Sequence, residues 1–406
     1  MNDRTRVIVL GGGFAGLQAV KTLVKKAPNA ELTLIDANAY ATMLPALPDV
    51  LSGRVPGWAL TRSFTDILTK GVRLVQDRIT AMDFGARLLT GAHETYRYDY
   101  LVVANGSRPA FFGFTPSSGT LHTLHSYTAA ESLRAELLRS SRETDHTTLV
   151  VVGGGYTGLE VATFAHHGFA DLRPGLSILV VERADSILSF VPEKGRRKVL
   201  AYLQSIEVEL KTGVSLEELN STVAKLSDGT TVHNPVVCWT AGMQGANDTI
   251  AGSVDQTRDK RLQTNEYLQL PVHPEVFVAG DAAALGKGHA AALSNGDAVL
   301  RRALIFAYDS GRLAADNCVR VMQGRELRAF HPVDPGWVIP LGGMSLGKLF
   351  GFLPVGGRWG LRLHYFLAGI RHFGAAQAWE FMKTALFLGR APDKPDRTRP
   401  PSGPLA

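Results

Sequence analysis

Three glycines at fixed spacing, with an acidic residue further on, are the first residues in this chain whose types could do chemistry. Gly11-x-Gly13-x-x-Gly16 comes directly after the apolar run RVIVL and before a stretch with helical periodicity. In such a strand-turn-helix unit the first glycine makes a tight turn, the second lets backbone approach a phosphate, and the third lets the helix pack closely on the strand. The next strand, ELTLID, ends at Asp36, which is placed to bind the ribose hydroxyls of a dinucleotide.

This first glycine turn therefore predicts a dinucleotide site. The helix that follows it begins with N–H groups that lack intrahelical partners, and its dipole favours an anion at that end. We expect the dinucleotide to be bound by the residues of the turn and the acid after it, namely Gly11, Gly13, Phe14, Ala15, Gly16 and Asp36.

The same order of residues returns in the middle of the chain. The strand TLVVV leads into a second glycine turn, and a helix and the strand LSILVVE follow, ending at Glu182. A carboxylate there suits the free hydroxyls of NAD(H) and repels the 2′-phosphate of NADP(H), although the adjacent Arg183 weakens this preference. Two such sites predict one permanent flavin dinucleotide and one exchanging nicotinamide dinucleotide. The second site is predicted at Gly153, Gly155, Tyr156, Gly158 and Glu182.

Two further stretches resemble a known family. YDYLVVANGSRP at 98–109 and EVFVAGDAAAL at 275–285 look like the remaining flavin-binding stretches of the two-dinucleotide-binding flavoproteins, the pyridine nucleotide-disulfide oxidoreductases. The resemblance implies an α/β fold with two Rossmann-like domains and bound FAD. It implies that Ala104 and Gly106 approach FAD where the chain crosses between domains.

The resemblance also places residues around the reactive rings. It implies that Gly280 and Asp281 bind the ribityl chain or pyrophosphate of FAD, and that the helix after them points its N-terminus at the flavin ring. A helix N-terminus there would stabilise the anion that forms when flavin accepts a hydride. VVCWTAG at 236–242 resembles the second crossing between domains, with Gly242 beside the nicotinamide site.

The positions of the cysteines and one further stretch of sequence indicate which branch of the family the chain resembles. The two cysteines, Cys238 and Cys318, match neither the redox pair of dithiol reductases nor the flavin-flanking cysteines of sulfide:quinone oxidoreductases. AYATMLPALPDVLSGRV at 39–55 resembles type II NADH dehydrogenases, whose acceptor is a membrane quinone. That resemblance implies Pro45 near the flavin and Glu160 near the nicotinamide amide. The apoptosis-inducing-factor-like quinone reductases share much of this pattern.

One departure concerns the acceptor side. Type II enzymes carry an Ala-Gln…Gln pattern on the helix after the second flavin motif, whereas this chain reads GKGHAAALSNGDAV at 286–299. Ala290 and Ser294-Asn295 stand where the glutamines would align, so the usual hydrogen bonds to a quinone are missing. His289 is the candidate substitute as a proton donor, and a surface or capping role is the alternative.

These observations leave three functions open. The resemblance favours an FAD-dependent NADH oxidoreductase that passes a hydride to flavin N5 and two electrons to a quinone, with NADPH as the less suitable donor. A flavin reductase using oxygen, ferredoxin or another protein acceptor is the second. A non-enzymatic NADH-binding redox sensor is the third. The pI of about 9.3 has no nucleic-acid-binding motif behind it, and no cysteine and histidine cluster predicts a metal site.

The C-terminal part has a composition of its own. Residues 326–406 carry ten basic and five acidic residues, and 330–360 are rich in Gly, Pro and large apolar residues. Proline and charged residues interrupt every long apolar run, so strands and turns are predicted there rather than a membrane-spanning helix. A basic helix follows whose apolar residues recur at helical spacing, namely Trp359, Leu363, Phe366, Ile370 and Phe373, and a second helix adds Trp379, Met382 and Leu386. Such helices lie in a lipid interface or contact a dimer partner.

The domain organisation follows from the order of these motifs. We predict an FAD-binding domain at 1–115 and 255–325, an NAD(H)-binding domain at 116–254, a segment for membrane or dimer contact at 326–390, and a disordered tail at 391–406. The N-terminus runs into a strand without a charged-then-apolar leader, so no secretory signal is expected. The expected location is the cytoplasm, peripheral on the inner face of the cell membrane.

Overall fold

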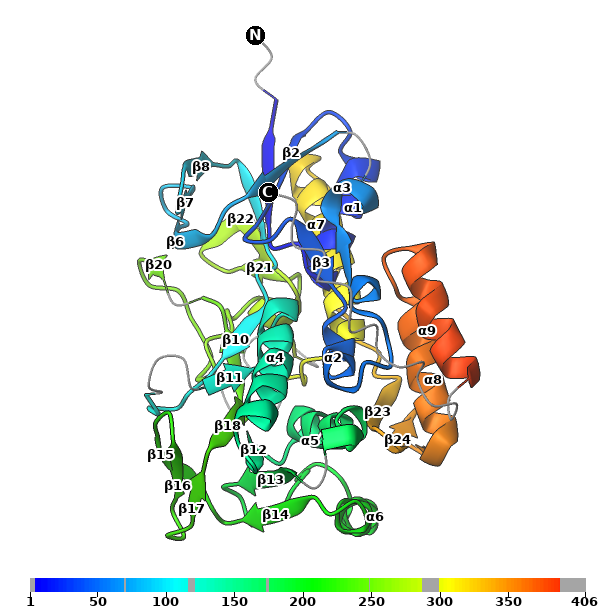
Figure 1. Ribbon diagram of the computed structural model, residues 1–406. Helices are drawn as coiled ribbons and strands as arrows, with labels where there is room; N and C mark the ends of the chain where they lie inside the picture. The colour runs from blue at the N-terminus through cyan, green and yellow to red at the C-terminus, as the bar shows by residue number, and fades with distance from the viewer. Residues whose placement is uncertain are drawn as a thin grey trace. The chain divides into compact units, whose positions relative to one another are not determined.

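The chain forms two compact units, which Figure 1 shows as ribbons in a computed structural model. Residues 4–68, 71–115, 121–172, 175–247, 249–286 and 299–387 are described. Unit 1 comprises Met1–Ala41, Arg62–Arg108 and Met243–Asp334, and unit 2 comprises Thr42–Thr61, Pro109–Gly242 and Pro335–Ala406. The units therefore divide the chain at other positions than the predicted domain ranges, and 42–61 and the C-terminal part both belong to unit 2.

Unit 1 is built on a sheet whose β-branched strands are buried on both faces, as a parallel sheet covered by helices requires. Across the sheet the strands are β21 (Gln269–Leu270), β22 (His273–Val278), β9 (Tyr100–Val103), β1 (Arg6–Leu10), β2 (Glu31–Asp36) and β5 (Val72–Gln76). All neighbours are parallel except β21 and β22. Helices α1 (Phe14–Lys26) and α7 (Leu304–Met322) pack on the sheet and on each other.

The remaining elements of unit 1 are short. A second sheet has the order β20 (Ile250–Ala251), β6 (Ile79–Asp83), β7 (Leu88–Gly91) and β8 (Thr95–Arg97). Helix α3 (Phe64–Ile67) begins at a serine cap, because the Ser63 hydroxyl accepts the Thr65 N–H. Four short strands lie at the borders of the units: β3 (Tyr40–Thr42), β4 (Thr61–Ser63), β10 (Ser107–Pro109) and β19 (Met243–Gly245).

Unit 2 repeats the architecture with another parallel sheet. Its strands, in order, are β11 (Leu121–Thr123), β18 (Pro235–Trp239), β12 (Thr147–Val152), β13 (Leu176–Glu182) and β14 (Glu209–Thr212). The helices α4 (Tyr127–Glu143) and α5 (Tyr156–Gly168) contact it, and α6 (Glu193–Ser205) precedes β14. An antiparallel sheet adds β15 (Leu216–Leu219), β16 (Val223–Leu226) and β17 (Thr231–His233). The short helices α2 (Asp49–Ser52), η1 (Leu44–Ala46), η2 (Gly57–Ala59) and η3 (Ala170–Leu172) complete it.

The C-terminal part of unit 2 has the strands and helices that the sequence predicts. Strands β23 (Gly336–Leu341), β24 (Met344–Leu349) and β25 (Leu353–Gly356) form an antiparallel sheet, and α8 (Gly357–Ile370) and α9 (Ala375–Phe387) follow side by side (Figure 1). Among the described residues, no helix has both the length and the apolar character to cross a bilayer. The predicted disordered tail, 391–406, lies outside the described residues.

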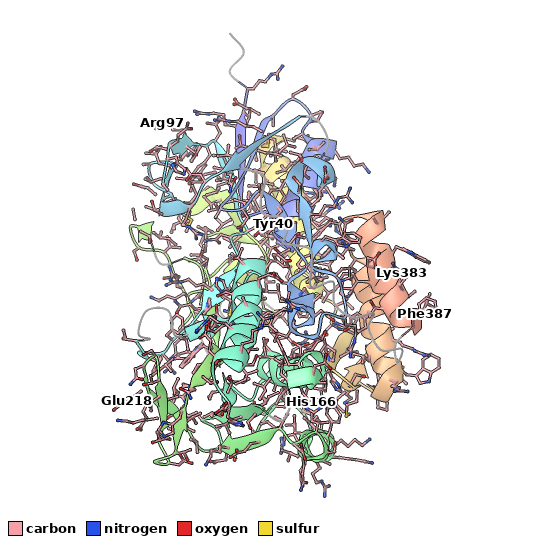
Figure 2. All side chains as sticks on the ribbon, viewed as in Figure 1. Tyr40, Arg97, His166, Glu218, Lys383 and Phe387 are labelled. Carbon is pink, nitrogen blue, oxygen red and sulfur yellow. The ribbon has the colours of Figure 1, made fainter. Side chains whose placement is uncertain are left out.

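Helix α8 presents two apolar faces of different kinds. One face is buried, with Tyr365 at 0% exposure, and packs on β24 and α9. The other carries part of the apolar row found in the sequence and faces solvent: Trp359 is 78% exposed and Ile370 59%. Side chains of α9, such as Lys383 and Phe387, are labelled in Figure 2. The exposed large apolar residues here are Phe350, Phe352, Leu353, Trp359, Phe366, Ile370, Trp379, Leu386 and Phe387, which we call the aromatic face.

Candidate functional site

The first glycine turn brings backbone segments too close together for any side chain. Gly11 has φ of +99°, and a Cβ there would lie 2.3 Å from the Ala104 carbonyl oxygen at the end of β9. A Cβ on Gly16 would lie 1.8 Å from the Gly11 carbonyl oxygen, so only glycine lets α1 begin this close to β1. Around Gly13 the geometry is the opposite, because no atom lies within 4 Å of the Cβ position. That open space beside the backbone is what a phosphate needs.

Asp36 is attached to this turn by hydrogen bonds. The Gly12 N–H donates to Asp36 Oδ2 at 2.6 Å, and the Asn38 N–H donates to Oδ1 at 2.7 Å. Burial raises the pKa of Asp36, and these N–H groups act in the opposite direction by stabilising the carboxylate. The acid therefore lies directly beside the backbone that would hold a pyrophosphate, where its remaining hydrogen-bonding capacity suits ribose hydroxyls.

The second turn reproduces this geometry in unit 2. Gly153 has φ of +116°, and a Cβ on Gly158 would lie 1.8 Å from the Gly153 carbonyl oxygen, while the Cβ position of Gly155 is open. Glu182 corresponds to Asp36: its Oε2 accepts the Gly154 N–H at 2.7 Å and its Oε1 accepts the Ala184 N–H at 2.7 Å. The internal repeat of the sequence is thus a repeat of two complete strand-turn-helix-strand-acid units.

Both helices begin without a side-chain cap. Gly13 precedes α1 and Gly155 precedes α5, and neither helix has a side chain that accepts its first N–H groups. Anions bind at such ends because N–H groups and the helix dipole point at them. We call each glycine turn, together with the helix start that follows it, a cradle: Gly11–Gly16 in unit 1 and Gly153–Gly158 in unit 2. The two cradles therefore fit the phosphates of two dinucleotides.

Other predicted residues of the turns pack within their own unit. The Phe14 ring lies against Tyr308, with centroids 5.6 Å apart. Ala15 is enclosed by glycines, since a Cβ on Gly311 would lie 2.1 Å from its carbonyl oxygen. The Tyr156 hydroxyl donates to the Val338 carbonyl. These side chains position the helices that carry the cradles.

The two stretches predicted to cross between domains, 98–109 and 236–242, have backbone that lies close to other groups. The Ala104 N–H donates to the Leu10 carbonyl at 2.8 Å, which continues β9 to the edge where Gly11 turns. Gly106 has φ of +73°. A Cβ on Gly242 would lie 2.6 Å from the Phe112 ring. Pro45 lies in η1 of unit 2.

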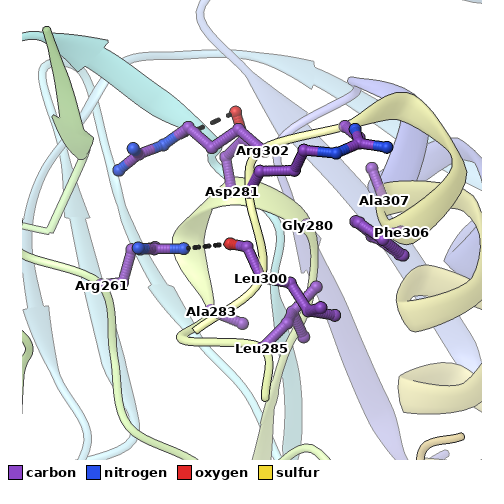
Figure 3. A pocket seen from close by; sticks show the side chains of 11 residues that line it. Arg261, Gly280, Asp281, Ala283, Leu285, Leu300, Arg302, Phe306 and Ala307 are labelled. Carbon is purple, nitrogen blue, oxygen red and sulfur yellow. Dashed lines mark hydrogen bonds and ion pairs between the residues drawn. The ribbon is translucent and has the colours of Figure 1, made fainter. Parts of the chain in front are cut away.

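Asp281 lies in a pocket of unit 1 with arginines (Figure 3). The Ser107 hydroxyl donates to Asp281 Oδ2 at 3.0 Å, and Arg302 Nε lies 3.9 Å from the same oxygen. Burial raises the pKa of Asp281, and the Arg302 guanidinium lowers it. Gly280 has φ of +65°, and its N–H donates to the Ser310 hydroxyl at 2.9 Å. The pocket is lined by Arg261, Gly280, Asp281, Ala283, Leu285, Leu300, Arg301, Arg302, Ala303, Phe306 and Ala307.

Sequence reasoning did not find Arg302, because its acidic partners lie on other segments of the chain. Arg302 Nη2 also pairs with Asp259 at 2.9 Å, so the guanidinium lies near two acidic residues, Asp259 and the pocket residue Asp281. The adjacent Arg261 donates from Nη1 to the Leu300 carbonyl at 2.9 Å (Figure 3).

Gly280–Ala282 form a 3₁₀ helix, and the chain continues through a bridge between Ala283 and Leu262. The helix that the resemblance implies after Asp281 falls on residues 287–298, which lie outside the described residues; the next described helix, α7, begins at Leu304. His289, Ala290, Ser294 and Asn295 lie outside the described residues.

Both cysteines are enclosed in the cores of their units. Cys238 and Cys318 are each 0% exposed, and burial raises the pKa of both thiols to about 12. Near neutral pH both are therefore uncharged thiols, which are poor nucleophiles. Among the described residues, no three His, Cys, Asp or Glu side chains gather as metal ligands would.

Glu160 belongs to a buried polar cluster in unit 2 that the sequence did not reveal. It is 4% exposed on α5, and its Oε1 has no hydrogen-bond partner among the described residues. Burial raises its pKa well above the usual range, and the nearby Asp49 adds to that rise. Asp49 is 1% exposed on α2 and accepts the Tyr365 hydroxyl at 2.6 Å. Burial raises the pKa of Asp49 to about 6, against the pull of Arg54.

Comparison with known proteins gives a family. The sequence model of the pyridine nucleotide-disulphide oxidoreductase family matches residues 5–298 of this chain. The chain is 26% identical over 384 residues to the type II NADH:quinone oxidoreductase of Staphylococcus aureus strain NCTC 8325, covering 88% of this chain and 92% of the relative. It is 25% identical over 361 residues to the protein of the same name from Staphylococcus haemolyticus, covering 84% and 88%.

Solved structures share the fold at low sequence identity. NDH2 of Plasmodium falciparum in complex with NADH matches with a TM-score of 0.80 and 14% identity, over 95% of this chain and 99% of that chain. The sulfide:quinone oxidoreductase of Aquifex aeolicus matches with a TM-score of 0.73 and 17% identity, over 95% of each chain. The arrangement of elements is therefore common to proteins that differ in most residues.

The buried Asp49 predicts a pH-dependent stability difference. The folded protein keeps this proton up to about pH 6, whereas the unfolded chain releases it near the ordinary value of 3.8, so stability falls as pH rises through this window. Asp49→Asn has no proton to lose and can still accept the Tyr365 hydroxyl. The variant should gain about 3 kcal/mol relative to wild type between pH 4 and 6.5. Melting temperatures that run parallel across this range would contradict the assignment.

Proposed function

The chain belongs to the pyridine nucleotide-disulphide oxidoreductase family, and we propose that it is an FAD-dependent NADH dehydrogenase that passes electrons to a quinone. Its relatives in Staphylococcus carry that activity in their names. The observation that carries the proposal is the duplicated cradle, with an open glycine, an uncapped helix and an acid attached to the turn in each unit. One cradle alone would serve a nucleotide-binding protein, whereas two serve a transfer between two nucleotides.

The cradle of unit 1 is proposed to hold FAD. Gly11, Gly13 and Gly16 receive its pyrophosphate at the start of α1, and Asp36 binds its adenosine ribose. Asp281, which is held by Ser107 and Arg302, lies at the end of β22 on the same sheet and binds the ribityl or pyrophosphate part. A bound flavin supplies chemistry that the side chains lack, because it accepts a hydride and returns two electrons to a second acceptor. FAD-binding and NAD(H)-binding domains are assigned to the ranges 1–115 with 255–325 and 116–254.

The cradle of unit 2 is proposed to bind NADH. Glu182 accepts the Gly154 N–H of the turn and the Ala184 N–H after β13, so its negative charge lies where the 2′-phosphate of NADPH would be repelled. Gly155 leaves room for the pyrophosphate at the start of α5. Glu160 follows on the same helix, and we propose that it faces the nicotinamide side of this site. His289 is retained as a candidate proton donor.

The aromatic face is proposed to place the enzyme on an anionic membrane surface, where a quinone dissolves. Its apolar side chains are exposed in spite of their size, and Arg358 and Arg362 accompany them on α8, with the Arg362 guanidinium 5.8 Å from the Trp359 ring centroid. Apolar burial and attraction of Lys and Arg to anionic headgroups add in such helices. The same face is also the site for a homodimer contact if no lipid covers it.

Substitution of the last glycine in each turn should weaken nucleotide binding at that turn alone. Gly16→Ala and Gly158→Ala each place a Cβ 1.8 Å from a backbone oxygen, so the turn must shift. A shift that costs about 1–3 kcal/mol lowers affinity roughly ten- to hundredfold. Gly16→Ala should purify with little flavin. Gly158→Ala should keep its flavin and lose NADH affinity, as measured by titration, and equal effects of both variants would contradict the assignment of the cradles.

The function is tested by anaerobic mixing followed by a choice of acceptors. NADH should bleach the flavin absorbance faster than NADPH does, and menaquinone or ubiquinone in liposomes should then restore it faster than oxygen or ferredoxin. Restoration by oxygen or ferredoxin alone would indicate the second function left open by the sequence. Bleaching that none of these acceptors reverses would indicate the redox sensor.

The aromatic face should control lipid binding. Trp359→Glu and Ile370→Glu should each lower binding to anionic vesicles about tenfold or more, because each removes an apolar side chain worth about 1.5–3 kcal/mol on burial. Val272→Glu is the control, since the exposure of Val272, 66%, lies between those of Ile370 and Trp359 and the residue belongs to unit 1. Vesicle co-sedimentation at low and high salt measures the effect. Unchanged binding of the α8 variants, with or without loss of a dimer, would sink the membrane assignment.

A further inference from the structure

The order of the strands in unit 2 gives the direction in which a dinucleotide lies across its parallel sheet. The second cradle is at the carboxyl end of β12, and Glu182 is at the carboxyl end of β13. In the sheet, β13 and β18 lie on opposite sides of β12. Ligands of such sheets bind across the carboxyl ends of the strands. With its pyrophosphate at the cradle and its adenosine ribose at Glu182, a dinucleotide therefore extends its other half toward the end of β18.

The backbone after β18 borders the cradle and carries an aromatic ring. A Cβ on Gly153 would lie 2.9 Å from the backbone nitrogen of Ala241, so the glycine turn and the end of β18 are in direct contact. Gly242 follows, and a Cβ there would lie 2.6 Å from the ring of Phe112. The Phe112 ring thus lies one residue beyond the backbone that borders the cradle, in the direction of the nicotinamide half.

Phe112 and Gly113 are the two central residues of a tight turn. The Phe114 N–H donates to the Phe111 carbonyl at 2.9 Å, and φ is +49° at Phe112 and +89° at Gly113. Turns with two central residues of positive φ favour Asn-Gly or Gly-Gly, because a bulky side chain in the left-handed region is strained. A phenylalanine at the first central position is therefore unfavourable for the turn itself.

The turn is anchored on both sides of Phe112, whose own ring is left uncovered. The rings of Phe111 and Phe114 lie against Trp239, with centroids 5.7 and 5.3 Å apart, and the Trp239 Nε1–H donates to the Ala110 carbonyl at 2.9 Å. Phe112, in contrast, is 67% exposed. The surrounding contacts thus hold one strained aromatic residue at the surface, which costs both backbone strain and exposed apolar area.

We propose that Phe112 binds the nicotinamide riboside half of the dinucleotide in unit 2 through its exposed ring. This rests on the proposed function, because it concerns the NADH site assigned there. Strained backbone is kept at sites where a ligand uses it, and an aromatic ring gains free energy when a flat heterocycle covers it. The contact distinguishes NAD(H) from ADP-ribose, which has the same adenosine, pyrophosphate and second ribose but lacks the nicotinamide ring.

A second phenylalanine turn in unit 2 provides a matched control. Among the described residues, Phe350 is the other phenylalanine with a positive φ, at +51°, and it is 64% exposed. Gly351 follows with φ of +76°, and the Phe352 N–H donates to the Leu349 carbonyl at 3.1 Å. This turn joins β24 to β25 and belongs to the aromatic face. It reproduces the strain and the exposure of Phe112 and has no part in the proposed nucleotide site.

The test compares Phe112→Asn with Phe350→Asn in the purified flavoprotein. Asparagine is favoured at this position of such turns, so both variants should keep or raise the melting temperature. Calorimetric titration with NAD⁺ and with ADP-ribose measures binding without turnover. We expect Phe112→Asn to weaken NAD⁺ binding about three- to tenfold and to leave ADP-ribose binding unchanged. Phe350→Asn should leave both affinities unchanged.

Two further variants separate the ring from the fold of the turn. Phe112→Gly adopts a positive φ without strain and should behave as Phe112→Asn does, whereas Phe112→Tyr keeps the ring and should keep the NAD⁺ affinity of the wild type.

Three results would overturn the proposal: NAD⁺ affinity that is unchanged in Phe112→Asn and Phe112→Gly, an equal loss of NAD⁺ and ADP-ribose affinity in these variants, or the same loss of NAD⁺ affinity in Phe350→Asn. A wild type that binds neither NAD⁺ nor ADP-ribose would instead overturn the proposed function.

Discussion

The structure depends on a steric constraint at two glycines. Gly16 and Gly158 each lie so close to a carbonyl oxygen of the preceding turn that a single methyl group would overlap it. This contact fixes where α1 and α5 begin, and with them the direction of their first N–H groups. Because a hydrogen bond joins the acid to each turn, the acid lies beside the backbone N–H groups that can bind an anion. In each unit the parallel sheet places this turn at the carboxyl end of its strand, β1 or β12.

The second constraint concerns α8, which separates a polar interior from an apolar exterior. Its inward face carries Tyr365 to Asp49, and its outward face carries Trp359 and Ile370 into solvent. A soluble protein rarely leaves such large side chains uncovered together. The same helix therefore joins the buried polar cluster of unit 2 to the exposed aromatic face. The acidic interior and the aromatic exterior are two sides of one element.

Much of the fold could be predicted from the sequence, because glycine spacing and β-branched runs are local signals. The strand-turn-helix units around Gly11 and Gly153 follow from those signals, and the strands and helices after Gly336 follow from Pro and Gly placement and helical periodicity. The helix that the resemblance implies after Asp281 stays a prediction, because residues 287–298 lie outside the described residues and the next described helix, α7, starts at Leu304.

The buried cluster could not be predicted, because no local pattern joins Asp49 to Tyr365. The two residues are far apart in sequence and meet through packing of α8 on unit 2. Arg302 escaped for the same reason, since its partners Asp259 and Asp281 lie on separate segments.

The central claim is that one chain holds two different dinucleotides in two like cradles. Counting bound nucleotides per chain tests it most directly, by releasing and quantifying the tightly held flavin and by equilibrium dialysis with NADH. The account predicts one FAD that stays through purification and one further NADH site that FAD does not occupy. A chain that carries no flavin even after refolding with FAD, or one on which FAD and NADH compete for a single site, would contradict it.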